Sequence, residues 1–161
     1  MTRLFYEKIL ASKFPELQWI RVCTSAPFTV AVYTCDANLD LNEQMISKLN
    51  LFLSQNGLAS NRHIVKHYFE LQKDEAFPIG QIPDCVKAAA LRGNVTGAGV
   101  QHSIKTAFPF IDSEHFEVEK NEVTFYLKNN EQWTLYQIQF VEMMLAEILP
   151  AGSVAKLAFS S

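Results

Sequence analysis

The chain has 161 residues, a formal net charge of −3, 48% hydrophobic residues and three Cys. A chain of this length forms one domain or two small ones, and it buries enough apolar surface to fold without a disulfide framework or a structural metal. No apolar run is long enough for a transmembrane helix, and positive charge is too sparse for a strongly basic nucleic-acid-binding class.

The first half of the chain predicts the element order helix, strand, strand, helix, strand. Amphipathic spacing indicates the helices, and runs rich in Val, Ile, Thr and aromatic residues indicate the strands. Both faces of the second strand are apolar, so we expect that strand to be central. The longer helix is expected to be capped by Asp40 or Asn42 and to end at Gly57 in the left-handed conformation. The expected ranges are 2–13, 18–24, 28–35, 41–56 and 63–72.

A connection over residues 78–83, rich in Pro and Gly, separates this half from the second. We therefore expect an α+β protein made of two small α/β units over 1–77 and 84–161, with mixed or antiparallel sheets covered by helices. The alternative is that both units pack as a single domain. The second unit is expected to contain helices 84–91, 99–108 and 131–149, a hairpin of strands 115–119 and 122–128, and a last strand over 154–159.

The hairpin pattern predicts a register. Val118 is expected to pair with Val123, and Phe116 with Phe125, so that these apolar side chains share one packing face. Asn121 is expected to supply the positive φ that a two-residue turn requires. In the helix that follows, the expected buried stripe is Leu135, Ile138, Val141, Leu145 and Ile148. The expected solvent side contains Gln137, Gln139, Glu142 and Glu147.

The densest basic stretch is Arg62, His63, Lys66 and His67. On a strand, the two His would lie about 13 Å apart on one face, too far to share a metal ion. We interpret the stretch as a solvent-facing or partner-facing strand, and we expect no metal site. The stretch is also too short for autonomous nucleic-acid binding, so we expect a protein partner and only weak or indirect nucleic-acid contact.

Gly93, Gly97 and Gly99 precede a helical segment that carries His102 and Lys105. Backbone N–H groups at such a helix start can hold a phosphate. The spacing matches neither the P-loop nor the dinucleotide fingerprint. Two interpretations stay open: a flexible connection between helices, or a small-ligand site formed by Gly97, Gly99, His102 and Lys105.

The remaining polar and aromatic residues have structural interpretations. Cys85 or Ser103 with His102 or His115 could form a nucleophile and base, but no nucleophile-elbow motif is present, so we expect no catalytic residue and no cofactor. We interpret a cluster of acidic residues as a solvated face and the Trp and Tyr residues as core aromatics. We expect the cysteines to be buried or half-buried thiols in a reducing cytoplasm. The acidic residues are Asp112, Glu114, Glu117, Glu119 and Glu122; the aromatics are Trp19, Trp133, Tyr68, Tyr126 and Tyr136; the cysteines are Cys23, Cys35 and Cys85.

The element order and several local phrases resemble the N-terminal, non-catalytic region of PolC-type DNA polymerase III α subunits. The matching stretches are IRVCTSAPFTVAVYTCDANLDLNEQMISKLNLFLSQNG with HIVKHYFELQ, and AFPFIDSEHFEVEKNEVTFYLKNNEQW. The resemblance covers most of the chain and consists of hydrophobic spacings and turn residues. It implies a replication accessory module without active-site residues.

Three functional interpretations follow from the sequence. The first is a non-catalytic protein-interaction or assembly module, with the replication accessory region as its specific form. The second is a small enzyme or ligand-binding domain with a site near Gly93–Lys105. The third is a stand-alone regulatory protein of phage or mobile-element origin. The sequence does not determine the oligomeric state.

Overall fold

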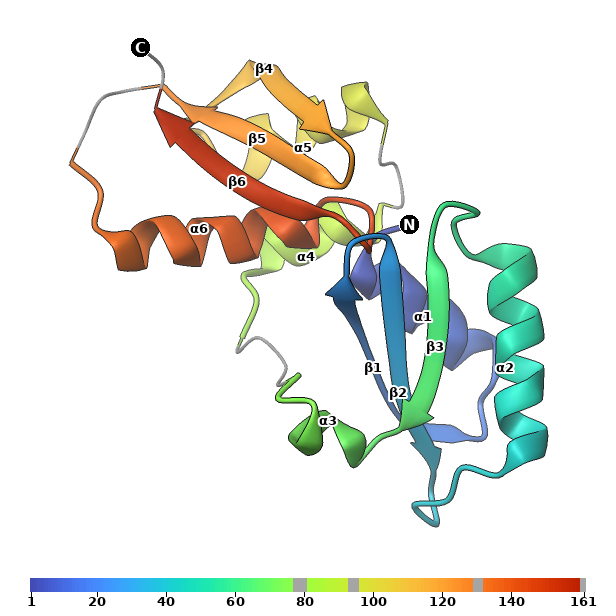
Figure 1. Cartoon of the computed structure of the whole chain (residues 1–161). Helices are drawn as coiled ribbons and strands as arrows, with labels where there is room; N and C mark the ends of the chain where they lie inside the picture. The colour runs from blue at the N-terminus through green and yellow to red at the C-terminus, as the bar shows by residue number, and fades with distance from the viewer. Residues whose placement is uncertain (77–80, 93–95, 129–131, 160–161) are drawn as a thin grey trace.

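The computed structural model describes residues 1–76, 81–92, 96–128 and 132–159. It contains two three-stranded sheets, one in each half of the chain, and helices pack against each sheet (Figure 1). The protein is therefore of the α+β class, built as two small α/β arrangements. Among the described residues, no helix has both the length and the apolar character to cross a bilayer.

The first sheet has the order β1-β2-β3, with β1 and β2 antiparallel and β2 and β3 parallel. The prediction that the second strand is central is confirmed, because β2 is buried along nearly its whole length. Tertiary burial on both sides explains its continuous apolar sequence. The elements of this half are α1 (Arg3–Lys13), β1 (Leu17–Ala26), β2 (Thr29–Asp36), α2 (Glu43–Asn56) and β3 (Arg62–His67).

The second sheet has the order β4-β5-β6 and repeats the same pattern, an antiparallel hairpin followed by a helix and a parallel strand. The predicted register is confirmed, since Val118 pairs with Val123 and Phe116 with Phe125. The elements are α4 (Asp84–Leu91), α5 (Gly97–Ala107), β4 (Ile111–Glu119), β5 (Glu122–Leu127), α6 (Leu135–Glu147) and β6 (Val154–Phe159).

The predicted strand over 63–72 is wrong in its second part. β3 ends at His67, and a short helix α3 (Glu70–Lys73) follows it. The Glu70 carboxylate accepts the N–H of His67 at 3.0 Å, and Phe69 has helical dihedral angles. The last backbone bond to the sheet runs from the Tyr68 N–H to Thr34 O at 3.1 Å. The chain turns away after it, where the N–H of Leu71 donates to Tyr68 O at 3.2 Å.

Of the two expected caps of α2, Asn42 is the one used, because its Oδ1 accepts the N–H of Met45. The backbone differs from expectation at two other turns. Gly57 follows α2 with a φ of −76°, so the expected left-handed conformation is wrong there. In the β4–β5 turn, Lys120 rather than Asn121 has the positive φ, at 56°.

Two side chains of α6 are placed opposite to expectation. Leu135, predicted to be buried, is 70% exposed, and Glu147, predicted to face solvent, is 2% exposed. The helix begins at Leu135 after a capping box on Thr134 and Gln137. Leu135 therefore lies in the first turn of α6, at the end of the helix that points away from the rest of the protein (Figure 1). Glu147 lies in the last turn, where the helix meets the first half of the chain.

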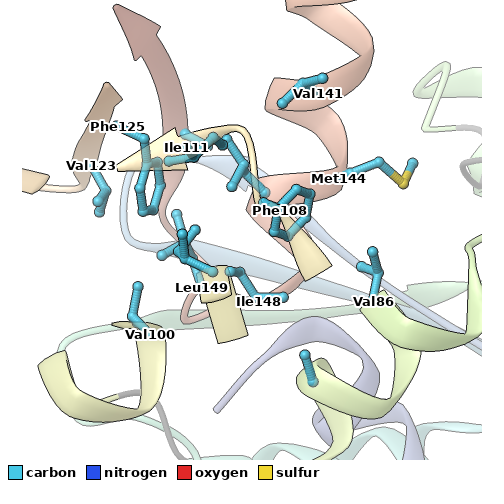
Figure 2. Close-up of a cluster of buried hydrophobic side chains, with 14 of the residues drawn as sticks. Val86, Val100, Phe108, Ile111, Val123, Phe125, Val141, Met144, Ile148 and Leu149 are labelled. Atoms are coloured by element: carbon cyan, nitrogen blue, oxygen red, sulfur yellow. The ribbon is translucent and has the colours of Figure 1, made fainter. Parts of the chain in front are cut away.

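Buried apolar side chains form a main cluster in each half. In the first half, the cluster joins α1 and α2 to one face of the sheet, and a smaller cluster of Ala31, Tyr33 and Leu71 joins α3 to the opposite face. In the second half, side chains of α4, α5 and α6 pack over Ile111 of β4 and Phe125 of β5 (Figure 2). The sheet positions in these clusters follow the two-residue period of strands.

Hydrogen bonds join the two halves near Gly152. The N–H of Phe28 donates to Gly152 O at 3.1 Å, and the N–H of Gly152 donates to Thr24 Oγ1 at 2.9 Å. The hydroxyl of Thr2 in turn donates to Ala90 O at 2.7 Å. The predicted boundary over 78–83 stays a prediction, and residues 77–80 within it lie outside the described residues.

Candidate interaction surface

Four aromatic rings and one leucine gather at one end of the first sheet and form what we call the aromatic patch. Trp19 is 46% exposed, Phe69 59% and Leu39 46%, while His67 and Tyr68 are partly buried between them. The sequence predicted Trp19 to be a core residue, and that prediction is wrong. The patch is assembled from the start of β1, the turn after β2 and the end of β3.

The rings of the aromatic patch pack against one another. Trp19 and Tyr68 have ring centroids 5.9 Å apart, and Tyr68 and Phe69 are 6.4 Å apart in an edge-on arrangement. His67 stacks on Phe69 at 5.2 Å. Such contacts hold exposed rings in fixed positions without burying them, so little side-chain entropy remains to be lost when a partner binds.

The His67 imidazole fixes the turn that carries the aromatic patch. Its Nε2 lies 2.8 Å from Leu39 O, and its Nδ1 lies 3.2 Å from the backbone N of Phe69. A carbonyl oxygen only accepts and a backbone N–H only donates, so the imidazole carries its proton on Nε2 and accepts at Nδ1. His67 thus ties Leu39 to Phe69.

Beside the aromatic patch, Asp74 collects two hydrogen bonds. Lys66 Nζ lies 2.6 Å from Asp74 Oδ2, and the hydroxyl of Tyr33 donates to the same oxygen at 2.8 Å. These two bonds lower the pKa of Asp74, and the bond from Lys66 raises the pKa of Lys66. Burial, followed by the bond to Asp74, raises the pKa of Tyr33 strongly. The arrangement fixes α3 against the sheet.

The four predicted contact residues of the basic stretch have different surroundings. His63 lies 2.9 Å from the Tyr6 hydroxyl through Nε2, and burial lowers the pKa of His63. Lys66 is bonded to Asp74 and His67 to Leu39, as described above. Arg62 is exposed and forms no ion pair within the described part of the chain. Their role in partner contact stays a prediction.

The predicted ligand residues are only partly brought together. Thr96 caps α5 by accepting the N–H of Gly99 at 3.3 Å, and Gly97 lines a groove of about 410 Å³ between the halves. The side chains of His102 and Lys105 are exposed, and Lys105 lies 3.7 Å from Glu114. Gly93 lies outside the described residues, and the ligand-site interpretation stays a prediction.

The remaining sequence candidates show bonds typical of structural roles. The Ser103 hydroxyl donates to Gly99 O at 3.0 Å, and the Tyr126 hydroxyl donates to Glu117 at 2.9 Å. Cys85 is exposed, which corrects the expectation that all three thiols are at least half-buried. Within the described ranges, no three His, Cys, Asp or Glu side chains group as a metal site would require.

A second feature that sequence reasoning missed is a cleft of about 670 Å³ between β1 and α6. On its wall, Arg3 Nε bonds both carboxylate oxygens of the buried Glu147 at 3.1 Å, and Arg3 Nη1 bonds Glu7 at 2.8 Å. Burial raises the pKa of Glu147, and Arg3 opposes that rise. Arg21 lies 4.0 Å from Glu7. This network links α1 to α6 across the chain.

The comparisons with known proteins identify no family. No family model matches the chain, and no curated protein matches it. Two solved structures of the periplasmic domain of the T3SS inner membrane protein PrgH from S. typhimurium are similar, at 13% identity and TM-scores of 0.35 and 0.34. The alignments cover 99% and 97% of this chain and 70% and 74% of those chains. Similarity at this level implies nothing about what this chain does.

Proposed function

We propose that the protein is a non-catalytic protein-interaction module that contacts its partner through the aromatic patch. The observation that carries the proposal is a set of exposed rings fixed by mutual contacts around Trp19, Tyr68 and Phe69. Contiguous exposed apolar side chains on a folded protein indicate an interaction site. Trp and Tyr are also the residue types that dominate binding energy at protein interfaces.

The sheet edges favour contact through side chains rather than through an added strand. Each of the four edge strands has a backbone N–H bonded to a carboxylate, a feature that blunts edge-to-edge pairing. The pairs are Val22 with Glu7 at 3.0 Å, His67 with Glu70 at 3.0 Å, Glu114 with Asp112 at 2.8 Å and Leu157 with Glu142 at 3.0 Å.

Site-specific photocrosslinking tests the proposal in the native cell. A photoreactive phenylalanine replaces Phe69 in one variant and Leu51 of α2 in a control, because the two side chains are similarly exposed at 59% and 60%. We expect a discrete crosslinked protein from position 69 and none from position 51. Equal crosslinking at both positions, or none at position 69, would refute the aromatic patch as the contact surface.

The specific form of this function that we propose is a replication accessory region, as the resemblance to PolC-type polymerases implies. The measurement is an immunoblot of native cells with an antibody against this domain. A band far larger than 18.3 kDa supports the polymerase form. A band at 18.3 kDa removes that form and supports a stand-alone regulatory protein.

A second candidate function is small-ligand binding at the groove that Gly97 lines. The supporting observation is the volume of about 410 Å³, which falls within the range of small-molecule sites. A thermal-shift screen with nucleotides and phosphorylated metabolites tests it, because a ligand that binds only the native state raises the melting temperature. Lys120 lines the groove, so a ligand whose effect is lost in Lys120→Ala would support this function over the first.

A further inference from the structure

The aromatic patch lies in an acidic part of the molecule. The turn 36–40 and the segment 66–75, which carry four of its five residues, contain five carboxylates and two lysines. The carboxylates are Asp36, Asp40, Glu70, Asp74 and Glu75, and the lysines are Lys66 and Lys73. This local excess of negative charge is unexpected from the basic stretch that the sequence shows at 62–67.

Lys66, which precedes His67 of the patch in the chain, already forms an ion pair. Lys66 is bonded to Asp74 at 2.6 Å, so it offers little attraction to an acidic partner. Within the described residues, no cation forms an ion pair with Asp36, Asp40 or Glu70. Asp40 is exposed in the turn that presents Leu39. The patch therefore combines an apolar aromatic centre with an unneutralised acidic rim.

We infer that the aromatic patch binds a partner segment that carries Arg or Lys next to apolar residues. The inference rests on the proposed function and names the chemistry of the partner. An apolar side chain of that segment would lie against Trp19 and Phe69, in the manner of an interface core, and its cations would face the acidic rim. A guanidinium or ammonium group also gains from the faces of exposed aromatic rings. An acidic segment would meet like charge at Asp36, Asp40 and Glu70 and associate more slowly.

Selection from a display library of random short peptides tests the inference without a known partner. The immobilised baits are the wild-type protein, Trp19→Ala with Phe69→Ala, and Leu51→Ala as a control of similar exposure on α2. We expect the wild type and the control to enrich sequences in which Arg or Lys alternates with Leu, Phe or Trp. The patch variant should lose that enrichment.

The affinity of one enriched peptide then measures the charge contribution. Asp40→Asn removes a rim charge without removing a described side-chain bond, and we expect it to weaken binding by about two- to five-fold. Added salt should weaken wild-type binding more than it weakens binding to Asp40→Asn.

The possible outcomes separate the two proposals. Enrichment that depends on Trp19 and Phe69 but consists of acidic or uncharged sequences would overturn the inference and leave the proposed function standing. Enrichment that is unchanged in the patch variant, or absent from the wild type, would overturn both. Circular dichroism of each variant shows whether it is folded, and Phe69→Leu replaces the double variant if that protein does not fold.

Discussion

The ion pair between Arg3 and Glu147 gives a stability prediction that can be worked from the structure. Glu147 is 2% exposed, and both of its carboxylate oxygens are bonded by Arg3 at 3.1 Å. Arg3→Met keeps the apolar stem of the side chain and removes the guanidinium. A buried charge that loses its partner costs about 3–5 kcal/mol if it stays ionised.

Protonation of Glu147 limits that cost. In the unfolded chain its pKa has the ordinary value of 4.5. Folding with a neutral Glu147 at pH 7 costs about 1.4 kcal/mol for each pH unit above that value, or roughly 3.4 kcal/mol in all. At pH 5 the same limit is only roughly 0.7 kcal/mol. We therefore expect Arg3→Met to lose about 3 kcal/mol of unfolding free energy at pH 7 and much less at pH 5.

The sign follows from proton binding. Burial raises the pKa of Glu147 in the folded protein, and removal of Arg3 raises it further. The folded state then binds more protons than the unfolded state, so stability increases as the pH falls through the folded pKa toward 4.5. In the variant this window extends to higher pH than in the wild type.

Urea unfolding, followed by far-ultraviolet circular dichroism between pH 7 and pH 5, measures the effect. Lys8→Met is the matched control, because Lys8 is exposed on the same helix. Arg3→Met combined with Glu147→Met should recover most of the lost stability, because a hydrophobic pair can replace a buried ion pair. A loss that is equal at pH 7 and pH 5, or no loss at all, would refute the reasoning.

Two further substitutions test the fold. Gly152→Ala should lower the free energy of unfolding by about 1–3 kcal/mol, because Gly152 has a φ of 93° and a Cβ there would collide with Asn61 Oδ1. Urea unfolding measures this, and an unchanged midpoint would contradict it. Leu135→Ala, on the exposed first turn of α6, should change stability by less than about 0.5 kcal/mol, whereas Leu145→Ala should cost about 2–5 kcal/mol. Equal losses at the two leucines would show that the first turn of α6 is buried after all.

Local chemistry made much of the second sheet predictable. The alternation around residues 116–125 determined which side chains share a face, and the pairs Val118 with Val123 and Phe116 with Phe125 followed from that period. The same reasoning did not predict where β3 ends. His63 to Phe69 is rich in strand-forming residues, and only the backbone bonds of the folded chain show that pairing stops after Tyr68.

The aromatic patch was only partly predictable. Trp19, Tyr68 and the basic stretch are visible in the sequence as candidates, but composition assigns aromatics to the core by default. Trp19 lies about fifty residues from Tyr68 in the chain, and the sheet order β1-β2-β3 brings their rings to 5.9 Å. The missed signal was the run His67-Tyr68-Phe69, which places three rings at a strand end beside a helix-forming segment.

The sequence by itself determined the α+β class, the order of the elements apart from the short helix α3, and the faces that pack in the β4–β5 hairpin, because these follow from hydrophobic period and local turn chemistry. The tertiary structure alone decided that Glu147 is buried and that Trp19 is exposed. Whether one residue at the end of a helix or strand is buried depends on which element packs against it. Arg3, which pairs with Glu147, and Tyr68, which contacts Trp19, are both distant from those residues in the chain.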